Sequence, residues 1–290
     1  MNKKGVVVKK LANDFWVKCD NDVFVCKPRG TLKSSGIFVG DNVMITLDHT
    51  NTIDKILERK NLLIRPPFAN LDQLIIVISP IPKPDFMIVD KLILFCYSHG
   101  IKPVLIVNKQ DLSCELNSYV LNNYSTFIET AFVSAKTNEN LTLLTQILKG
   151  HLSAFAGQSA VGKSALINSL FKNIKAVEGE LSQKINRGKN TTRHCEIFYN
   201  NDFMIADTAG FTSLDENLLT IPYYELAFYY PDYNKYKQEC RYSSCAHYNE
   251  PENDCKIKQL VKVDKLDKER YNRYRKLYES LEQRWVKTHG

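Results

Sequence analysis

A glycine-rich segment from Gly157 to Ser164 constrains the fold of this 290-residue chain more than any other feature. It matches the phosphate-binding pattern G-x-x-x-x-G-K-S and follows a short apolar run at Leu152–Ala156. Apolar residues at helical spacing come next, at Leu166, Leu170 and Phe171. The order strand, loop, helix places backbone N–H groups at a helix N-terminus, where they bind phosphate oxygens. We therefore expect a nucleotide-binding α/β domain rather than a glycine turn without a ligand.

The residues of this segment have distinct expected roles. The Lys163 ammonium should reach the β- and γ-phosphates, and the Ser164 hydroxyl should ligate Mg²⁺. The glycines allow backbone N–H groups to turn toward the phosphates. The other residues of the segment expected to contact the nucleotide are Gly157, Gln158, Ser159, Ala160, Val161, Gly162 and Ala165.

A second motif indicates which base is bound. Asn108, Lys109 and Asp111 form the pattern N-K-x-D directly after the apolar run Val104–Val107. The Asp111 carboxylate can accept hydrogen bonds from the ring N–H and the exocyclic amine of guanine. Adenine lacks this pair of donors and would leave the carboxylate unpaired. The motif therefore predicts GTP and GDP as the ligands.

A third motif supports the same base. Ser134, Ala135 and Lys136 stand at the end of the apolar run Ala131–Ser134. A backbone N–H at this point can donate to the guanine carbonyl. Because α/β sheets bind ligands at the carboxyl ends of their strands, we expect both base motifs to lie at one edge of the sheet.

Two further segments have the properties of nucleotide switches. Asp207 follows the apolar run Phe203–Ala206 in a D-x-x-G pattern that ends at Gly210. Its carboxylate suits a water-mediated contact to Mg²⁺, and the Gly210 N–H suits the γ-phosphate. Before it, Thr191 and Thr192 lie in a polar segment, and one of them is the expected switch threonine that ligates Mg²⁺.

The order of the motifs is unusual. Ras-like GTPases run phosphate loop, switch threonine, D-x-x-G, N-K-x-D and S-A-K, whereas here N-K-x-D and S-A-K come first. Such a rearrangement keeps every loop on the same edge of the sheet, so the pocket survives. The sequence thus predicts a circularly permuted GTPase that hydrolyses GTP to GDP and phosphate. Phe211 stands where Ras-like enzymes have the water-orienting glutamine, so slow intrinsic hydrolysis is expected.

Four potential metal ligands lie close together near the C-terminus. Cys240, Cys245, His247 and Cys255 have the spacing C-x(4)-C-x-H-x(7)-C. Three thiolates and one imidazole form a closed tetrahedral Zn²⁺ set of the structural kind. A redox dithiol and coincidence are the alternatives, but the cluster contains no C-x-x-C pair.

The regions on either side of the GTPase motifs differ in character. Residues 1–65 contain short alternating runs and turn signals that predict a small β-barrel, for which an OB-fold and an SH3-like barrel fit nearly equally. Residues 66–223 hold the GTPase motifs, and residues 224–290 hold the metal ligands and an amphipathic helix. Of the net charge of +7, the ends carry +5 (residues 1–33, eight basic minus three acidic) and +6 (residues 256–290, eleven minus five). This charge fits nucleic-acid binding and solvated surface lysines equally well.

Composition also bears on the location of the protein. No run approaches the ~18 apolar residues of a membrane span, and the N-terminus lacks the apolar core of a signal peptide. We expect a soluble cytoplasmic protein without a membrane partner. Nothing in the sequence indicates an obligate dimer, so a monomer is expected.

Taken together, these motifs resemble the ribosome small subunit-dependent GTPase family of the RsgA/YjeQ type. The junction segments Arg65-Pro66 and Ala69–Gln73, and Val39–Asp41 in the barrel, also look like that family. The resemblance implies an OB-fold that contacts ribosomal RNA and a GTPase that acts in late maturation of the small subunit. It also implies stimulation of hydrolysis by the subunit and a zinc domain that docks on it.

The chain departs from the family pattern at the switch segment. The family usually has a histidine directly before the two threonines, whereas this chain has Asn190. His194 follows the threonines at a position that is often histidine in the family, so Thr191, Thr192 and His194 form the expected catalytic set. The loop from His247 to Cys255 is about two residues longer than in the family, which a zinc loop can absorb.

Two other functions fit part of the sequence. One is a permuted GTPase that acts on the large ribosomal subunit, which the barrel and the zinc cluster together disfavour. The other is an RNA-binding protein that uses GTP only as a conformational ligand, an alternative that Phe211 and Asn190 support. Phosphate release in the presence of ribosomal subunits separates these functions.

Overall fold

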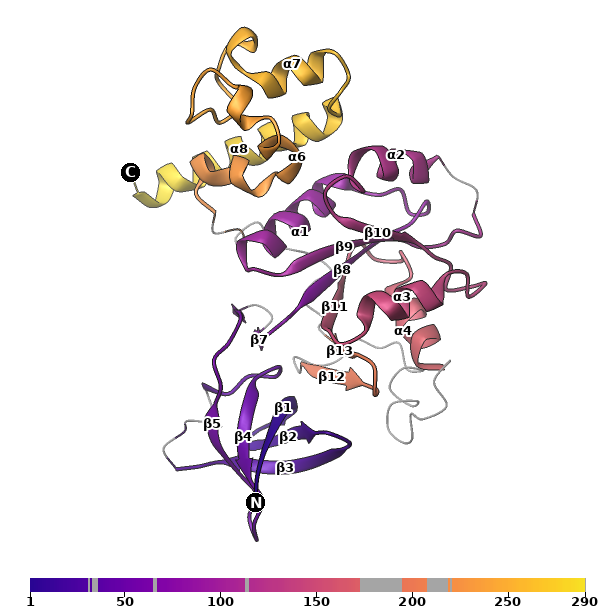
Figure 1. Cartoon of the computed structure of the whole chain (residues 1–290), viewed down its shortest axis with the longest axis vertical. Coiled ribbons are helices and arrows are strands. Elements are labelled where there is room, and N and C mark those ends of the chain that lie inside the picture. The colour runs from indigo at the N-terminus through magenta and orange to yellow at the C-terminus, as the bar shows by residue number, and fades with distance from the viewer. Residues whose placement is uncertain are drawn as a thin grey trace.

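The computed structural model describes residues 1–30, 32, 36–64, 67–112, 115–172, 195–207, 219 and 221–289. These residues form a β-barrel at one end of the molecule, an α/β core in the middle and a helical C-terminal part at the other end (Figure 1). The order of the three parts is the one expected from the sequence. Their limits at residues 1–65, 66–223 and 224–290 stay a prediction.

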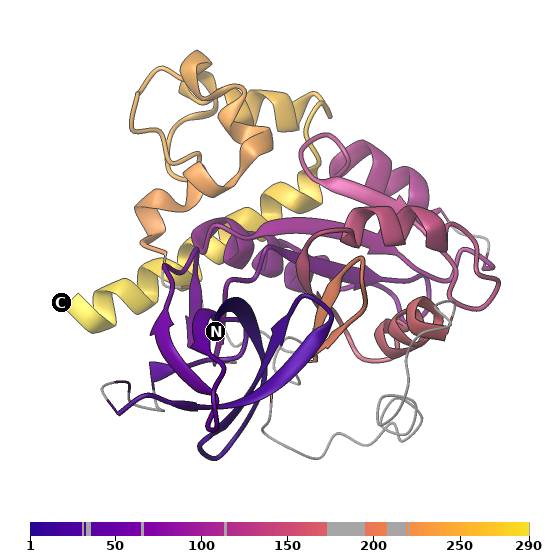
Figure 2. The same cartoon turned by 60° about the horizontal axis from the view of Figure 1, so that its bottom comes forward.

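The barrel is a closed ring of five strands. They are arranged in the order β1-β2-β3-β5-β4, and β4 pairs back with β1. The parallel pairing of β3 with β5 and the return of β4 to β1 make the ring OB-like, which decides between the two barrels that the sequence left open. Figure 2 turns the barrel toward the reader and shows its strands curving around a common interior. The strands are β1 (Asn2–Leu11), β2 (Asp14–Cys19), β3 (Asp22–Pro28), β4 (Asn42–Thr46) and β5 (Thr52–Ile56).

The interior of the barrel is filled by alternate residues of its strands. In β2, Phe15, Val17 and Cys19 are buried, while Trp16 and Lys18 between them are only half-buried. Successive side chains of a strand point to opposite faces, so one set packs inward and the other faces out. The same alternation in the sequence predicted the strands.

The core is a twisted, mostly parallel sheet in the order β10-β9-β8-β11-β13-β12. The first five strands are parallel, and β12 pairs antiparallel with β13. Its strands are β8 (Gln73–Ile78), β9 (Lys102–Val107), β10 (Glu129–Phe132), β11 (Leu152–Ala156), β12 (Glu196–Tyr199) and β13 (Met204–Asp207). A hairpin of β6 (Leu62–Ile64) and β7 (Pro67–Ala69) joins the barrel to this sheet.

Helices cover both faces of the sheet. All six residues of β8 are buried, as expected of a strand in the middle of a parallel sheet. On one face Ile76 belongs to the same apolar cluster as Leu92 of α1, and on the other Ile75 shares a cluster with Leu144 of α3 and Leu166 of α4. The described helices of the core are α1 (Phe86–Ser98), α2 (Leu116–Asn123), α3 (Leu141–Leu148) and α4 (Lys163–Lys172).

The barrel is joined to the core by strand pairing as well as by the chain. Lys9 of β1 is the Cα partner of Glu196 of β12, and their side chains form an ion pair at 3.2 Å. The ammonium of Lys18 in β2 lies 5.0 Å from the centre of the ring of Tyr199, which is in β12 like Glu196. The barrel strands and the core strands therefore form one continuous sheet.

The C-terminal part consists of short helical segments packed against one long helix. The long helix buries Tyr274, Leu277, Tyr278 and Leu281 at helical spacing, in the region where the sequence predicted an amphipathic helix. The segments are η4 (Tyr223–Tyr229), α6 (Pro231–Asn234), η5 (Lys237–Glu239), η6 (Glu252–Asp254), α7 (Lys256–Lys262) and α8 (Lys268–His289). No helix within the described ranges is long and apolar enough to cross a membrane.

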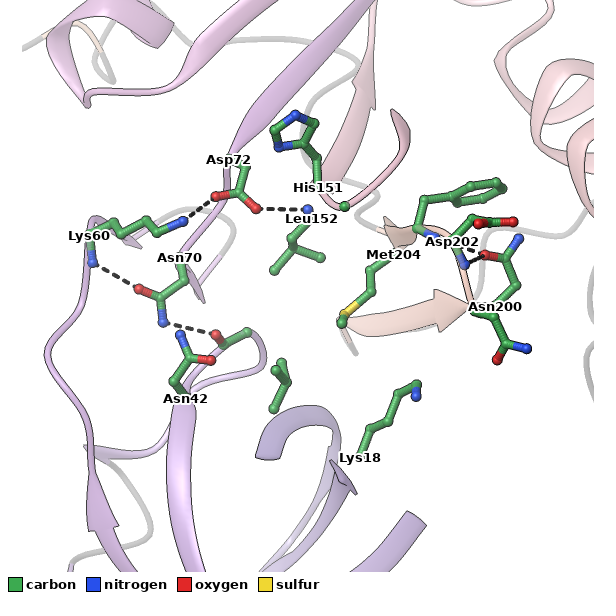
Figure 3. A pocket seen from close by; sticks show the side chains of 15 residues that line it. Lys18, Asn42, Lys60, Asn70, Asp72, His151, Leu152, Asn200, Asp202 and Met204 are labelled. Carbon is green, nitrogen blue, oxygen red and sulfur yellow. Dashed lines mark hydrogen bonds and ion pairs between the residues drawn. The ribbon is translucent and has the colours of Figure 1, made fainter. Parts of the chain in front are cut away.

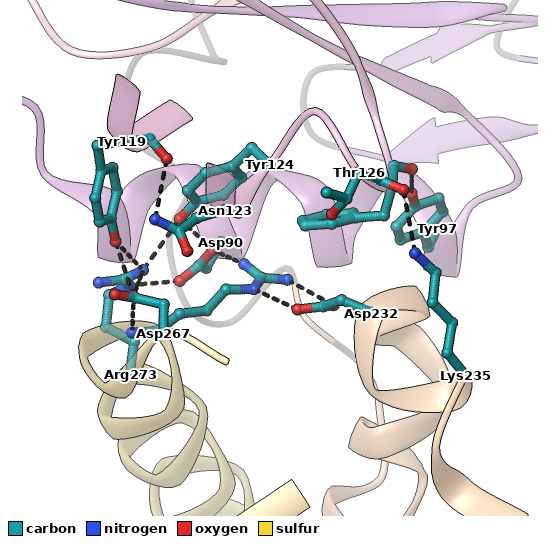
Figure 4. A network of polar contacts seen from close by, with 12 residues as sticks. Asp90, Tyr97, Tyr119, Asn123, Tyr124, Thr126, Asp232, Lys235, Asp267 and Arg273 are labelled. Atoms are coloured by element: carbon teal, nitrogen blue, oxygen red, sulfur yellow. Dashed lines mark hydrogen bonds and ion pairs between the residues drawn. The ribbon is translucent and has the colours of Figure 1, made fainter. Parts of the chain in front are cut away.

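A buried polar network attaches this part to α1 (Figure 4). The Arg270 side chain pairs with Asp90 of α1 and, through Nε at 2.9 Å, with Asp232 of α6. Arg273 Nε lies 2.6 Å from the other Asp90 oxygen, and the Tyr124 hydroxyl donates to Asp90 at 2.9 Å. Asp90 and Arg270 have side chains only 1% and 4% exposed. Each buried charge thus has an opposite charge and further hydrogen bonds, as burial requires.

Most predicted elements of the core have the predicted position. The run Leu152–Ala156 coincides with β11, and the run Val104–Val107 lies within β9. The run predicted at Phe203–Ala206 is shifted by one residue, so Asp207 ends β13 rather than following it. The unpredicted elements are short: β12 has four residues, and α2 buries only Val120, which leaves no periodicity to detect.

Candidate functional site

The base and phosphate motifs lie together at the carboxyl edge of the core sheet. The N-K-x-D motif follows β9, the S-A-K motif follows β10, and the phosphate loop joins β11 to α4. Asp207, the last residue of β13, is at the same edge, although its side chain is outside the described part. The permuted chain therefore brings its nucleotide motifs to the edge where α/β sheets bind ligands.

The phosphate loop requires glycine at both ends. Gly157 has φ of +127°, and a Cβ there would lie 2.2 Å from the carbonyl oxygen of Val77. Gly162 has φ of +98°, and a Cβ would lie 2.3 Å from Nδ2 of Asn108. Both the backbone conformation and the close approach exclude other residues. The loop thus has the tight form in which backbone N–H groups surround a phosphate.

Lys163 lies at the start of α4 and reaches back over the loop. Its ammonium donates to the carbonyl oxygens of Gly157 and Gln158, both at 2.7 Å. Partial burial lowers the pKa of Lys163. Ser164 is exposed at the next position, in the first helical turn. The two side chains expected to contact phosphates and Mg²⁺ are therefore adjacent to the loop and accessible from solvent.

The N-K-x-D motif holds the site together. Asn108 donates to the carbonyl of Val161 in the phosphate loop at 2.9 Å and accepts from the Ala135 N–H at 3.1 Å. Lys109 donates to the carbonyl of Ala160 at 2.8 Å. These bonds connect the base motifs directly to the phosphate loop. They fix the distance between the part of the site that holds the base and the part that holds the phosphates.

Asp111 is held by the S-A-K motif. Its Oδ1 accepts from the Ser134 hydroxyl at 2.8 Å, and its Oδ2 lies 3.3 Å from the Lys136 ammonium. The Ser134 hydrogen bond, with a further contribution from Lys136, lowers the pKa of Asp111. The carboxylate is therefore ionised at neutral pH and can accept the two hydrogen bonds that guanine offers.

The expected switch residues lie outside the described residues. These residues are Thr191, Thr192, His194 and Gly210, together with Asn190 and Phe211. Their roles stay predictions. The site described above consists of the base motifs and the phosphate loop.

The four predicted zinc ligands meet in the C-terminal part. The Sγ atoms of Cys240, Cys245 and Cys255 lie 3.7, 3.2 and 3.5 Å from Nδ1 of His247. All four ligand atoms lie within 4.8 Å of one another. A tetrahedral Zn²⁺ with its usual bond lengths separates such ligand atoms by ~3.6 Å. The residues therefore fit a structural zinc ion with no open coordination position.

The electrostatics of the cluster agree with a bound cation. Burial lowers the pKa of His247 to about 4, so the imidazole is neutral at physiological pH, as a metal ligand must be. Burial raises the pKa of the Cys245 and Cys255 thiols, so their thiolates need a positive charge beside them. Tyr271 donates to the His247 carbonyl at 2.9 Å, which joins the cluster to α8.

Comparisons with known proteins agree with this geometry. Residues 56–217 match the model of the RsgA GTPase family. The small ribosomal subunit biogenesis GTPase RsgA of Ruminiclostridium cellulolyticum is 36% identical over 96% of this chain and 93% of that protein. The protein of the same name from Clostridium acetobutylicum is 37% identical over 93% of this chain and 95% of that protein. The chain belongs to the RsgA GTPase family.

Solved structures extend the likeness to the fold. YjeQ from Thermotoga maritima superposes with a TM-score of 0.78 at 29% identity, covering 97% of this chain and 99% of that chain. YloQ, described as a circularly permuted GTPase, gives a TM-score of 0.81 at 25% identity, covering 98% and 96%. The permuted order predicted from the motifs is thus confirmed, and this RsgA-family chain is a GTP hydrolase that uses Mg²⁺.

Some contacts of the RsgA-family site were not predicted from the sequence. The Gln158 side chain in the phosphate loop accepts from the N–H of Asp85, the N-cap residue of α1, at 2.9 Å. Lys109 also donates to the carbonyl of Ile81 in the segment before α1, at 2.6 Å. No local pattern signals either bond, because their partners are more than 25 residues apart.

Proposed function

We propose that this chain is a GTPase that acts in biogenesis of the small ribosomal subunit. The observation that carries the proposal is the gathering of the permuted base and phosphate motifs at one sheet edge, in a chain that matches proteins of that name almost from end to end. The alternative of a permuted GTPase for the large subunit lacks such support. Small-subunit RNA is the proposed partner, the chain acts as a monomer, and the cytoplasm is its proposed location.

The nucleotide binds with its phosphates in the loop and its base between the N-K-x-D and S-A-K motifs. Backbone N–H groups of residues 157–165 surround the phosphates, and the Lys163 ammonium offsets their charge. Asp111 accepts from guanine, while Ser134 and Lys136 hold its carboxylate in place. Asn108, Lys109 and Ala135 keep these two halves of the site at a fixed separation.

Hydrolysis in this proposal is a transfer of the γ-phosphoryl group to water. Mg²⁺ supplies positive charge to the phosphates, and Ser164 and Asp207 would hold it, directly and through water. Thr191, Thr192 and Gly210 would respond to the γ-phosphate, and His194 is the candidate for positioning water. Since a phenylalanine follows the D-T-A-G motif, the bound subunit is expected to complete the catalytic site.

The barrel and the zinc part are the proposed RNA-contacting parts. Residues 1–65 form the barrel, and residues 224–290 hold the four zinc ligands, whose ligation would hold the short segments beside α8 in place. Residues 1–33 of the barrel and residues 256–290 of the zinc part each contain more basic than acidic residues. Basic side chains that neutralise phosphates supply a large share of the affinity for RNA.

The test is GTP hydrolysis by the purified protein alone and with isolated small or large ribosomal subunits. We expect slow hydrolysis alone and stimulation of about 10³-fold or more by the small subunit only, since a supplied catalytic group raises the rate of other GTPases by roughly 10³–10⁵. Stimulation by the large subunit instead would favour the alternative function. Tight GTP binding without stimulation by either subunit would show that GTP is only a conformational ligand.

A further inference from the structure

A polar cleft lies at the amino-terminal edge of the core sheet, opposite the nucleotide site (Figure 3). It has a volume of about 300 Å³. One side is formed by the barrel and the other by Asp72 just before β8, the first residues of β11 and β13, and the β12–β13 turn. Its lining residues include Lys18 and Asn42 from the barrel and Asp72, His151, Leu152 and Met204 from the core.

The cleft contains hydrogen-bonding groups that the protein itself does not use. Within the described ranges, the side chains of Asn42, His151 and Asn201 make no hydrogen bond. Lys18 donates to the carbonyl of Asp20 and has no carboxylate partner in the same ranges, so its ammonium keeps free N–H groups. Unused donors and amides in a concave site are the features of a binding site for a polar ligand.

The charges of the cleft favour an anion beside Lys18. Asp72 is occupied on both oxygens: Oδ1 lies 2.6 Å from the Lys60 ammonium, and Oδ2 accepts from the Leu152 N–H at 2.8 Å. Asp202 provides the other carboxylate of the cleft. Its Oδ1 lies 3.9 Å from the Lys149 ammonium, and its side chain is half exposed. Both carboxylates therefore have a cation nearby, while the positive charge of Lys18 is unmatched. The Tyr199 ring, 5.0 Å away, holds the Lys18 ammonium in place.

The walls of the cleft are fixed before any ligand binds. The Asn70 side chain donates to the carbonyl of Gly40 in the barrel at 2.9 Å and accepts from the Lys60 N–H at 2.8 Å. At Gly40, φ is +92° and a Cβ would lie 2.0 Å from the Ala69 carbonyl oxygen, so the connecting segment passes closely against the barrel. A ligand would pay little to order these groups.

We propose that this cleft binds one phosphate-bearing nucleotide unit, with the phosphate on Lys18 and the base edge on the amides of Asn42 and Asn201. The volume is at the lower limit of the roughly 300–1,000 Å³ of small-ligand sites, which suits a single unit. Amide groups both donate and accept, as base edges require. The apolar side chains of Leu152 and Met204 form the wall beside the base, and a thioether packs well against an aromatic ring.

The favoured source of this unit is a single RNA strand, and this choice rests on the proposed function. The cleft is at the sheet edge away from GTP, so a strand can occupy it while GTP is bound. It also adjoins the basic barrel strands, along which a strand can continue. A free nucleotide offers the same chemistry, and the experiment distinguishes the two sources.

The experiment measures binding of a fluorescent single-stranded octauridylate by the full-length, GDP-bound protein, with unlabelled UMP, octauridylate and an acidic peptide as competitors. Two substitutions at the cleft, Lys18→Met and Asn42→Leu, are compared with Lys27→Met, which removes an exposed charge of the same barrel away from the cleft. We expect Lys18→Met to weaken binding by roughly tenfold and the two combined by more, the size of effect of hydrogen bonds to a charged group. Lys27→Met also removes one positive charge, so it should weaken binding slightly in a salt-dependent way. Apart from that general electrostatic effect, it should change binding by less than about twofold.

Cross-linking locates the bound strand independently of affinity. An octamer containing 4-thiouridine should cross-link to peptides that carry His151 or Asn201, and Lys18→Met with Asn42→Leu should abolish these products. Competition by octauridylate but not UMP identifies an RNA strand, and competition by UMP at equal molar nucleotide identifies a free nucleotide. Equal losses for Lys18→Met and Lys27→Met, cross-links elsewhere, or displacement by the acidic peptide alone would overturn the proposal.

Failure of this proposal is separable from failure of the proposed function. GTP affinity of each variant reports an intact core, because the cleft residues lie at the other edge of the sheet. Stimulation of the unchanged protein by the small subunit tests the proposed function alone. Cleft cross-links without stimulation would leave the RNA site standing, and stimulation without cleft cross-links would leave the proposed function standing.

Discussion

At the scale of single residues, Asp111 has the most specific chemistry in the nucleotide site. Its carboxylate is held by Ser134 at 2.8 Å and by Lys136 at 3.3 Å, so its oxygens have a fixed direction. A carboxylate only accepts hydrogen bonds, whereas an amide presents one acceptor and one donor. The identity of this side chain should therefore decide which base is bound.

We expect Asp111→Asn to weaken GTP binding by about 100-fold or more, since one guanine donor would face an amide N–H. The same substitution should improve binding of xanthosine triphosphate, which has a carbonyl where guanine has its amine. Titration of the protein with fluorescent analogues of both nucleotides measures the change. Glu139→Gln, at an exposed carboxylate of the loop after the S-A-K motif, is the control. Equal affinity of Asp111→Asn for the two nucleotides would contradict the assigned role.

At the scale of elements, the attachment of α8 to α1 depends on a few buried charges. Arg270 pairs with Asp90 and Asp232, and Arg273 adds a second contact to Asp90. The network stabilises the packing of the C-terminal part mainly by leaving no buried charge unpaired. Removing one member leaves the remaining charges buried without a partner. This lowers the free energy of unfolding far more than the loss of an exposed ion pair does.

Arg270→Ala should destabilise the packing of α8 on α1 by about 3–5 kcal/mol. Arg29→Ala is the matched control because Arg29 is 66% exposed and pairs with Asp54 in the barrel. It should cost about 0–1 kcal/mol. Thermal unfolding, with amide hydrogen exchange of α1 and α8, measures both effects. Unchanged exchange in α8 of Arg270→Ala would show that apolar packing alone holds the helix.

At the scale of the whole molecule, the barrel and the core share one sheet through β1 and β12. Lys9 and Glu196 form the ion pair at this joint, and both are about three-quarters buried or more. Because β12 is the edge strand of the core, the barrel covers backbone groups that would otherwise be unpaired. The barrel should therefore unfold together with the core.

Glu196→Lys places two ammonium groups together at the joint and should separate the unfolding of the barrel from that of the core. Calorimetry should then show two transitions. Hydrogen-exchange measurements should show faster amide exchange in β1 and β12 than elsewhere. Glu129→Lys is the control for the change of charge, since Glu129 pairs with Lys102 on the opposite edge strand of the core, at a more exposed position away from the barrel. Identical single transitions in both variants would mean that the chain connection alone couples the two parts.

The sequence by itself determined the features that depend on local patterns. The glycines and lysine of the phosphate loop, the N-K-x-D and S-A-K motifs and the spacing of Cys240, Cys245, His247 and Cys255 each indicate chemistry without a fold. Buried runs such as Leu152–Ala156 were recognisable because a strand covered on both faces must be apolar throughout. The order of the motifs along the chain was enough to predict a permuted core.

Only the tertiary structure decided how distant segments meet. It distinguished an OB-like ring from an SH3-like barrel, because closure depends on strand pairing that alternation does not encode. It also brought Asn108 to Val161, Arg270 to Asp90 and the barrel to the start of β11, where the polar cleft lies. These contacts join residues 53 and 180 positions apart in the first two cases. A local pattern reports the burial of a residue and not its partner, so such contacts follow only from the folded chain.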